Sequence, residues 1–264
     1  MAKSEQKSIF VTGAGSGIGR ATAQLFAERG WFVGLADISR EGLEDTAATL
    51  PEGQRISMML DVRDRTEWAR AMETFGQVTN RRMHVLFNNA GVGTGGLLED
   101  MSDDDIDLVI DVNLRGVIHG VRAALPLLRE TRGARIVNTA SVAGIIGCPK
   151  VSIYTATKFA VRGLTEALDA EFAAYGVRVT SLAPWFIDTP ILDQTGGTNR
   201  SLRDALKASK TPIYPARMAA ERAWDAAHGE DVHYMVGKQA ERTQFMARMF
   251  PKTTRNKARQ AFGD

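Results

Sequence analysis

The sequence predicts an α/β fold: a doubly wound parallel sheet of about seven strands within one domain. Short apolar segments alternate with amphipathic helical segments, and a glycine-rich stretch follows the first apolar segment. Strands that are apolar throughout are typical of a parallel sheet with helices on both faces. The length of 264 residues and the 44% hydrophobic composition suffice for one core. Neither an internal repeat nor a second domain is expected over residues 1–264.

The apolar segments are expected to form strands at residues 8–12, 31–36, 55–60, 83–87, 134–140, 176–182 and 232–236. Apolar residues at helical spacing predict helices over residues 17–29, 64–77, 154–168, 216–227 and 239–250, with two more beginning near Ser39 and Ser102. Residues 185–215 break this pattern and are expected to form a substrate loop with a short helix at 202–209. Residues 251–264 are expected to form a basic C-terminal tail or a solvated helix face.

The stretch TGAGSGIGR, residues 12–20, lies between the first strand and the first helix. Gly13, Gly17 and Gly19 have the spacing G-x-x-x-G-x-G. Glycines permit a tight turn and let the backbone approach a pyrophosphate, and the N–H groups at the amino end of a helix attract that anion. A glycine turn without a ligand is the alternative, but the position between a strand and a helix favours dinucleotide binding.

Asp37 follows the second expected strand, twenty residues after Gly17. An acidic residue at this place typically accepts hydrogen bonds from the adenosine ribose, and a carboxylate would repel a 2′-phosphate. The prediction is therefore NAD, with NADP disfavoured. The alternatives are an Asp that caps the next helix and an influence of the nearby Arg40.

The segment from Ser141 to Lys158 carries the predicted chemistry. Tyr154 and Lys158 are four residues apart in a helical segment, so they share one helical face. A phenol has a pKa of about 10, and a nearby cation favours the phenolate and brings the group into working range. Ser141 ends the fifth strand, at the sheet edge where ligands of α/β proteins bind. The alternative is an ordinary amphipathic helix that carries Tyr and Lys by chance.

Composition and charge argue against several other classes of function. The formal net charge is +2, and no dense basic stripe suggests a nucleic-acid partner. Cys148 is the only cysteine, so no intrachain disulfide forms, which is compatible with a reducing cytoplasm. The first ten residues lack the apolar run of a signal peptide, and no segment is long and apolar enough to span a bilayer. No metal site is expected.

Together these motifs resemble the short-chain dehydrogenase/reductase family in its single-domain form, which has a Rossmann fold. The resemblance spans about residues 8–236 and also rests on DV at Asp61, NNAG at Asn88, Asn113 and PWFIDT at Pro184. It implies four catalytic roles: Tyr154 is the acid/base, Ser141 orients the substrate oxygen, Lys158 holds the nicotinamide ribose and lowers the Tyr154 pKa, and Asn113 supports a water leading from Lys158 toward solvent.

The resemblance also implies which residues hold the cofactor. The pyrophosphate is expected to meet Gly13, Ser16, Gly17, Ile18 and Gly19. Asp37 is expected to bind the adenosine ribose, Asp61 and Val62 the adenine, and Asn89 its neighbourhood. Ile187 and Thr189 are expected to meet the nicotinamide carboxamide, alongside Tyr154 and Lys158 at the ribose.

One departure from the family pattern is Trp185, where Gly usually follows the Pro after the sixth strand. Trp185 and its apolar neighbours predict a hydrophobic alcohol or ketone as the substrate. The expected function is an NAD-dependent alcohol dehydrogenase or ketone reductase that forms a homodimer or homotetramer. The alternatives are a catalytically silent nucleotide-binding scaffold of the same fold, and a lyase or epimerase that recycles bound NAD.

Overall fold

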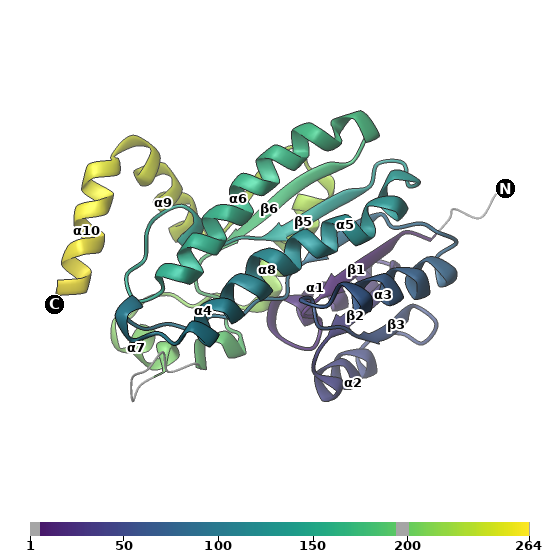
Figure 1. Ribbon diagram of the computed structural model, residues 1–264, viewed down its shortest axis with the longest axis horizontal. Coiled ribbons are helices and arrows are strands. Elements are labelled where there is room, and N and C mark those ends of the chain that lie inside the picture. Colours follow the sequence, from purple (N-terminus) through teal and green to yellow (C-terminus); the bar gives the residue numbers. More distant parts are fainter. Residues whose placement is uncertain (1–5, 194–200, 264) are drawn as a thin grey trace.

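The computed structural model describes residues 6–193 and 201–263, with side chains described up to residue 260. It contains the predicted seven-stranded parallel sheet, in the order β3-β2-β1-β4-β5-β6-β7 (Figure 1). The strands are β1 (Ser8–Thr12), β2 (Phe32–Asp37), β3 (Arg55–Met59), β4 (Val85–Asn88), β5 (Arg135–Thr139), β6 (Arg178–Pro184) and β7 (His233–Val236). The α/β fold class is confirmed, and the strand order reverses between β1 and β4, where such sheets bind ligands.

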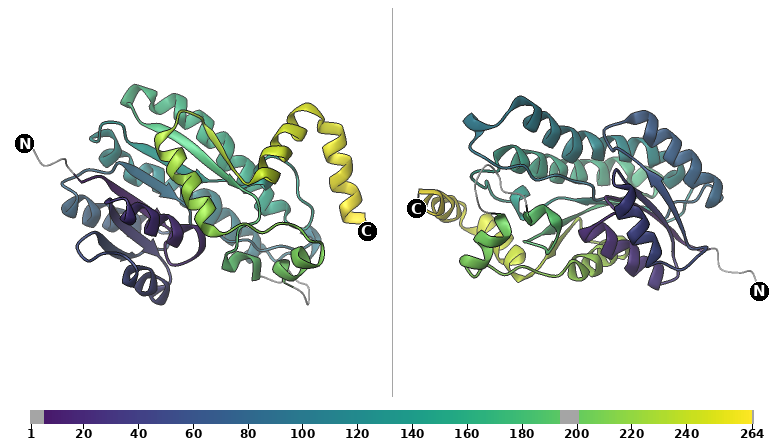
Figure 2. Two further views of the ribbon diagram at one scale, coloured as in Figure 1. Left: turned by 180° about the vertical axis from the view of Figure 1, so that it is seen from behind. Right: turned by 90° about the horizontal axis from the view of Figure 1, so that it is seen from below.

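Helices cover both faces of the sheet (Figure 2). One face packs against α1 (Gly17–Glu28), α2 (Arg40–Ala48) and α8 (Ala216–His228). The other packs against α3 (Arg65–Val78), α5 (Gly116–Arg129) and α6 (Ser152–Phe172). The remaining helices are α4 (Asp103–Ile110), α7 (Leu202–Ala208), α9 (Lys238–Met249) and α10 (Pro251–Gly263).

Buried aromatic rings fill both cores. On the α3 face, Phe10 of β1 meets Phe75 edge-on with ring centroids 5.3 Å apart, and Trp68 lies 5.8 Å away. On the α8 face, Phe26 contacts Trp31 and Trp224 at 5.0 and 4.9 Å. The Phe10–Phe75 and Phe26–Trp31 pairs are edge-to-face, a geometry that adds to the stabilisation from burial itself.

Side-chain caps fix where several helices begin. Ser39 accepts from the Gly42 N–H, Asp64 accepts from two N–H groups of α3, and Ser102 accepts from the Asp105 N–H. The helix expected from Ser102 is divided, because a π-helical turn over Asp111–Arg115 separates α4 from α5. Residues 251–263, expected as a basic tail or a solvated helix face, form the separate helix α10 after Phe250. Residues 194–200 of the expected substrate loop lie outside the described residues.

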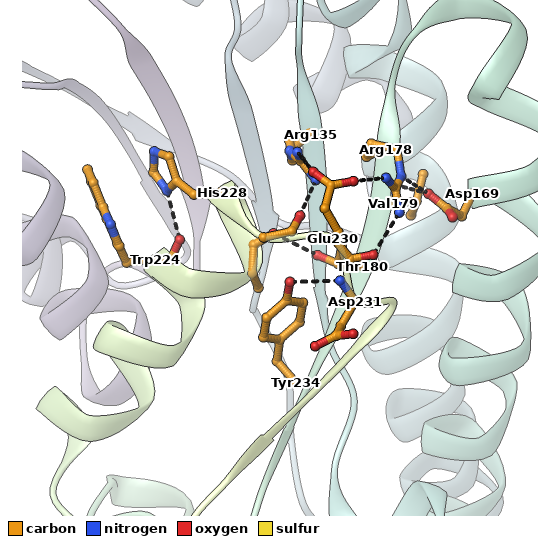
Figure 3. Close-up of polar contacts among 12 residues, drawn as sticks. Arg135, Asp169, Arg178, Val179, Thr180, Trp224, His228, Glu230, Asp231 and Tyr234 are labelled. Atoms are coloured by element: carbon orange, nitrogen blue, oxygen red, sulfur yellow. Dashed lines mark hydrogen bonds and ion pairs between the residues drawn. The ribbon is translucent and has the colours of Figure 1, made fainter.

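A polar clasp joins the amino ends of β5 and β6 to the loop before β7, at the edge opposite the carboxyl ends (Figure 3). Arg178 donates to Asp169 Oδ1 at 3.0 Å and to Glu230 Oε2 at 2.6 Å, and Arg135 donates to the Gly229 carbonyl at 2.7 Å. Asp169 also accepts from the buried N–H of Val179 at 2.9 Å. The carboxylate of Asp169 therefore satisfies a strand N–H that faces no solvent.

Replacing Asp169 by Ala is expected to lower the free energy of unfolding by about 1–3 kcal/mol, because the Val179 N–H loses its acceptor inside the protein. Activity at a temperature well below unfolding is expected to stay unchanged, since the clasp lies away from the strand ends that carry the site. Thermal or urea unfolding measures the effect. The control is Glu171→Ala, which removes an exposed carboxylate from the same helix, α6. Equal stabilities of the two variants would contradict the role assigned to Asp169.

Candidate functional site

Predicted site residues and their neighbours lie at the carboxyl ends of the central strands. Thr12 ends β1, Asp37 ends β2 and Asn88 ends β4, while Ser141 follows β5 by two residues and Trp185 follows β6 directly. Parallel pairing of β1 with β4, of β4 with β5 and of β5 with β6 brings these ends to one edge of the sheet. This edge is where doubly wound folds bind their ligands.

The glycine loop has the backbone geometry that only glycine adopts readily. Gly13 has φ +66° and Gly17 has φ +51°, both in the left-handed region. A Cβ on Gly19 would lie 2.0 Å from the Gly13 carbonyl oxygen, so the first turn of α1 packs directly on the loop backbone. Ser16 is the N-cap residue of α1, and its side chain makes no cap bond. The loop therefore presents main-chain N–H groups at a helix amino end, as a pyrophosphate site requires.

Asp37 reaches the glycine loop. Its Oδ2 accepts from the Gly15 N–H at 2.8 Å, and its Oδ1 accepts from the Ser39 N–H at 2.9 Å. Ser39, not Asp37, supplies the N-cap of α2. Asp37 thus lies beside the loop where a ribose-binding acid is expected, and it is held rigidly there.

Asn89 ties the end of β4 to the same loop. Its Nδ2 donates to the Thr12 carbonyl at 3.0 Å and its Oδ1 accepts from the Thr139 hydroxyl at 3.4 Å. The Thr12 hydroxyl in turn accepts from the N–H groups of Asn89 and Ala90, at 3.0 and 3.1 Å. Sequence reasoning named Asn89 but missed Thr12 and Thr139, whose signal is a polar residue at the end of an apolar strand.

The three central residues of the predicted chemistry come together. Lys158 is 3% exposed, and its Nζ donates to the Thr139 carbonyl at 2.9 Å. The same Nζ lies 5.4 Å from the Tyr154 ring centroid, as their spacing on α6 predicts. Ser141 follows β5, caps a short 3₁₀ turn by accepting from the Ala143 N–H at 3.1 Å, and hydrogen-bonds Tyr154 through its side chain.

Burial shifts the pKa values of Tyr154 and Lys158. Burial raises the pKa of Tyr154 above its ordinary value, and the hydrogen bond with Ser141 opposes this only in part. Burial lowers the pKa of Lys158 to about 8. The physical cause of both shifts is desolvation, which disfavours the phenolate and the ammonium alike. The expected lowering of the Tyr154 pKa by Lys158 stays a prediction.

Asn113 lies in the π-helical turn and is completely buried. Its Oδ1 accepts from the Val92 N–H at 2.9 Å and its Nδ2 donates to the Val92 carbonyl at 2.8 Å. A Cβ on Gly91 would lie 3.1 Å from Asn113 Oδ1 and 3.8 Å from Lys158 Nζ, so both side chains flank Gly91. Asn113 therefore fixes the segment after β4 beside Lys158, and π turns of this kind are frequent at functional sites.

The residues expected near adenine lie at the end of β3. The Asp61 carboxylate pairs with Arg63 at 2.6 Å, and this hydrogen bonding lowers the pKa of Asp61. The Val62 side chain is buried against Gly116, and its carbonyl accepts from Trp68 Nε1 at 3.0 Å. Val62 thus contributes to the core as well as to this end of the site.

The segment after β6 returns to the glycine loop. A Cβ on Gly17 would lie 2.8 Å from Thr189 Cγ2, and the Thr189 hydroxyl donates to the Ile187 carbonyl at 3.3 Å. Ile187 is buried and forms a bridge with Tyr214. Thr189, expected at the nicotinamide, therefore lies close to Gly17, expected at the pyrophosphate, and Ile187 is tied to Thr189.

Trp185 forms an apolar wall near Ser141. Trp185, Ile145 and Ile146 all pack against the buried cluster that contains Val142 and Met235, and the Trp185 ring centroid lies 5.2 Å from that of Phe186. The main-chain N–H of Trp185 donates to the Val236 carbonyl at 3.2 Å. Trp at the position where the family usually has Gly therefore keeps a main-chain hydrogen bond to the end of β7. In the nearby loop, burial raises the pKa of the Cys148 thiol, which argues against a nucleophilic role.

Comparison with known proteins decides the family. A family described as short chain dehydrogenase matches residues 7–199. The chain is a member of the short-chain dehydrogenase family. The sequence-based resemblance is thereby confirmed, over the glycine loop, the Ser141–Lys158 segment and the segment after β6.

This short-chain dehydrogenase is similar to several characterised proteins. It is 40% identical over 193 residues to the 3-oxoacyl-[acyl-carrier-protein] reductase FabG of Thermotoga maritima, covering 72% of this chain and 78% of that protein. It is 36% identical over 200 residues to the meso-2,3-butanediol dehydrogenase of Serratia marcescens, covering 76% and 78%. A crystal structure of a short-chain dehydrogenase/reductase from Burkholderia phymatum in complex with NAD covers 96% of each chain, with a TM-score of 0.85 and 32% identity.

Among residues 6–193 and 201–263, no cluster of His, Cys, Asp and Glu side chains has the arrangement of a metal site. Within the same described residues, none of the helices combines the length and the apolar character that crossing a bilayer requires.

Proposed function

We propose that this short-chain dehydrogenase interconverts a secondary alcohol and a ketone with a nicotinamide dinucleotide. The observation that carries the proposal is the convergence of Ser141, Tyr154 and Lys158 beside the glycine loop. The loop fits a pyrophosphate, because the close contact of Gly19 with Gly13 leaves main-chain N–H groups at the α1 amino end. A bound nicotinamide would supply the hydride acceptor or donor at its C4 atom.

The protein's own residues move the proton. In the oxidation direction the Tyr154 phenolate takes the proton of the alcohol oxygen, while the C–H bond electrons leave as hydride. Ser141 hydrogen-bonds the same oxygen and orients it. Lys158 holds the nicotinamide ribose, and Asn113 supports proton exchange with solvent. The bound cofactor would be lined by the residues of the glycine loop, of the ends of β3 and β4, and of the segment after β6: Gly13, Ser16, Gly17, Ile18, Gly19, Asp61, Val62, Asn89, Ile187 and Thr189.

The cofactor is NAD under this proposal, since Asp37 would accept hydrogen bonds from the ribose and repel a 2′-phosphate. The Asp37→Ala variant is expected to raise the ratio of kcat/KM with NADP to kcat/KM with NAD at least tenfold. Steady-state kinetics with both cofactors measure this ratio. Asp45→Ala is the control, because it removes a neighbouring exposed carboxylate that pairs with Arg20. An unchanged ratio in Asp37→Ala would refute the assignment.

The reaction rate is expected to depend on pH with opposite signs for alcohol oxidation and ketone reduction. Oxidation needs the Tyr154 phenolate, and burial raises the pKa of Tyr154, so the oxidation rate is expected to rise with pH from neutral into the alkaline range. Reduction needs the protonated phenol, so its rate should fall as pH passes that pKa. Profiles of kcat/KM for both directions test this. A flat oxidation profile would contradict it.

The substrate is proposed to be a hydrophobic alcohol or ketone, because Trp185, Ile145 and Ile146 form an apolar wall beside Ser141. The names of the characterised relatives describe enzymes that act on alcohol or keto groups. One of them, levodione reductase from Leifsonia aquatica, is 37% identical over 195 residues. Turnover of a panel of secondary alcohols tests the proposal, and a strong preference for small charged polyols would overturn the apolar assignment.

We further propose that the protein is a single-domain enzyme of the cytoplasm that assembles as a homodimer or homotetramer.

A further inference from the structure

Helices α9 and α10 form a C-terminal arm, and α10 stands away from the sheet in every view (Figures 1 and 2). The amino end of α9 packs on β7, whereas α10 packs on α9. Three large apolar side chains remain exposed where the two helices meet: Phe245 is 59% exposed, Met249 55% and Phe250 50%. Side chains of this kind at the hinge of a projecting arm mark an interaction surface.

The arm is also strongly basic. Residues 238–264 contain seven Lys and Arg against two acidic residues, whereas residues 1–237 contain 26 against 29. Lys252, Arg255 and Arg259 follow the spacing i, i+3, i+7, so they line one face of α10. All three are exposed, and none forms an ion pair with an acidic group among the described residues. The apolar hinge is therefore continued by a row of positive charge.

A second surface of the chain combines exposed apolar side chains with negative charge and so complements the arm. Leu97 and Leu98 are 38% and 55% exposed, and Leu98 begins a short 3₁₀ turn that leads to α4. Around them the sequence carries six acidic residues and no basic one between positions 97 and 107: Glu99, Asp100, Asp103, Asp104, Asp105 and Asp107. We call residues 97–107 the acidic surface. It thus pairs exposed apolar side chains with negative charge, as the arm pairs them with positive charge.

We infer that the C-terminal arm docks onto the acidic surface of a second copy of this chain. Opposite charges steer the two surfaces together and suppress other pairings, and the exposed Phe, Met and Leu side chains are buried on contact. A second copy is favoured over a lipid surface because the chain itself carries the complement of the arm, exposed Leu side chains beside negative charge, whereas residues 252–260 of α10 contain Ala258 as their only apolar residue.

The docking position lies next to the site. The Gly96 N–H, just before the acidic surface, donates to the Lys150 carbonyl at 2.7 Å in the loop that leads into α6. An arm docked there would lie beside the loop that precedes Tyr154 of the second copy. The inference concerns assembly and does not depend on the proposed reaction.

Cross-linking tests which copy receives the arm. In a Cys148→Ser background, the pair Glu99→Cys and Arg255→Cys is introduced into one chain and oxidised mildly. Under this inference at least half of the chains are expected to run as covalent dimers on a non-reducing gel, and reduction should abolish the band. The control pair is Glu52→Cys with Arg255→Cys, because Glu52 is an exposed acid outside the acidic surface. Absence of the dimer, or formation of an intrachain disulfide only, would overturn the inference.

Charge exchange supplies the second measurement. Reversing the arm with Lys252→Glu, Arg255→Glu and Arg259→Glu is expected to reduce the dimer cross-link at least tenfold when the Cys pair is placed at Leu98 and Phe250 instead. Adding Glu99→Lys, Asp100→Lys and Asp107→Lys to the same chain is expected to restore it. The control is the charge-conserving set Lys252→Arg, Arg255→Lys and Arg259→Lys. Sedimentation with phosphatidylserine vesicles is run in parallel; binding that depends on the arm while the cross-link does not would assign the arm to a membrane and overturn the inference.

Discussion

Replacing Tyr154 by Phe is expected to lower kcat by about 10²–10⁴-fold, the usual contribution of a positioned acid/base group. The phenol is the group that faces both Ser141 and the amine of Lys158, so its removal leaves the substrate oxygen without a proton partner. The phenyl ring keeps the shape of the side chain on α6. Affinity for NADH is therefore expected to stay within about twofold, as measured by fluorescence titration.

The matched control for this variant is Tyr175→Phe. Tyr175 is 43% exposed in the turn after α6 and lies under the Arg129 guanidinium, far from the strand ends. This variant should retain wild-type turnover. Turnover that survives in Tyr154→Phe would refute the assignment of the acid/base, and loss of NADH binding together with turnover would point to misfolding instead. Binding without turnover in the wild-type protein would support the scaffold alternative.

Gly19→Ala is expected to weaken NADH binding at least a hundredfold. A Cβ at this position would lie 2.0 Å from the Gly13 carbonyl oxygen and 2.7 Å from the Gly13 carbonyl carbon, which are backbone atoms that cannot turn aside. The loop must therefore shift away from α1, and its main-chain N–H groups no longer point at one anion. Isothermal titration with NADH measures the loss.

The control for Gly19→Ala is Gly163→Ala. Gly163 also lies within a helix, but a Cβ there would meet no atom within 4 Å. Alanine is the better helix former, so this variant should bind NADH normally and be at least as stable as the wild type. If Gly19→Ala bound NADH as tightly as Gly163→Ala did, the glycine loop would not be the pyrophosphate site.

Local patterns explain why much of the fold was predictable. Apolar runs such as residues 8–12 and 134–140 are visible in the sequence because a parallel strand is buried on both faces. The pairing of Tyr154 with Lys158 was predictable because a four-residue spacing puts two side chains on one helical face. Ser102 was recognisable as a cap because three acidic residues follow it at once.

The features that escaped prediction depend on tertiary contacts. The π turn around Asn113 adds one residue to a helix without disturbing its apolar pattern. The pKa of Tyr154 is set by how deeply the folded chain buries the phenol, which the Lys158 spacing does not reveal. Thr12 and Thr139 became relevant only because β1, β4 and β5 are neighbours, which brings both residues to Asn89.

The way the glycine loop is held has a consequence for how the enzyme reaches its native state. The loop near the amino terminus is braced by Asp37, by Asn89 and finally by Thr189, which lies more than half the chain away. Contacts so distant in sequence form slowly and late during folding. Dinucleotide affinity should consequently appear only after the sixth strand has been incorporated, so a nascent or truncated polypeptide will not retain the coenzyme, and the coenzyme in turn will protect the finished molecule against unfolding by mass action.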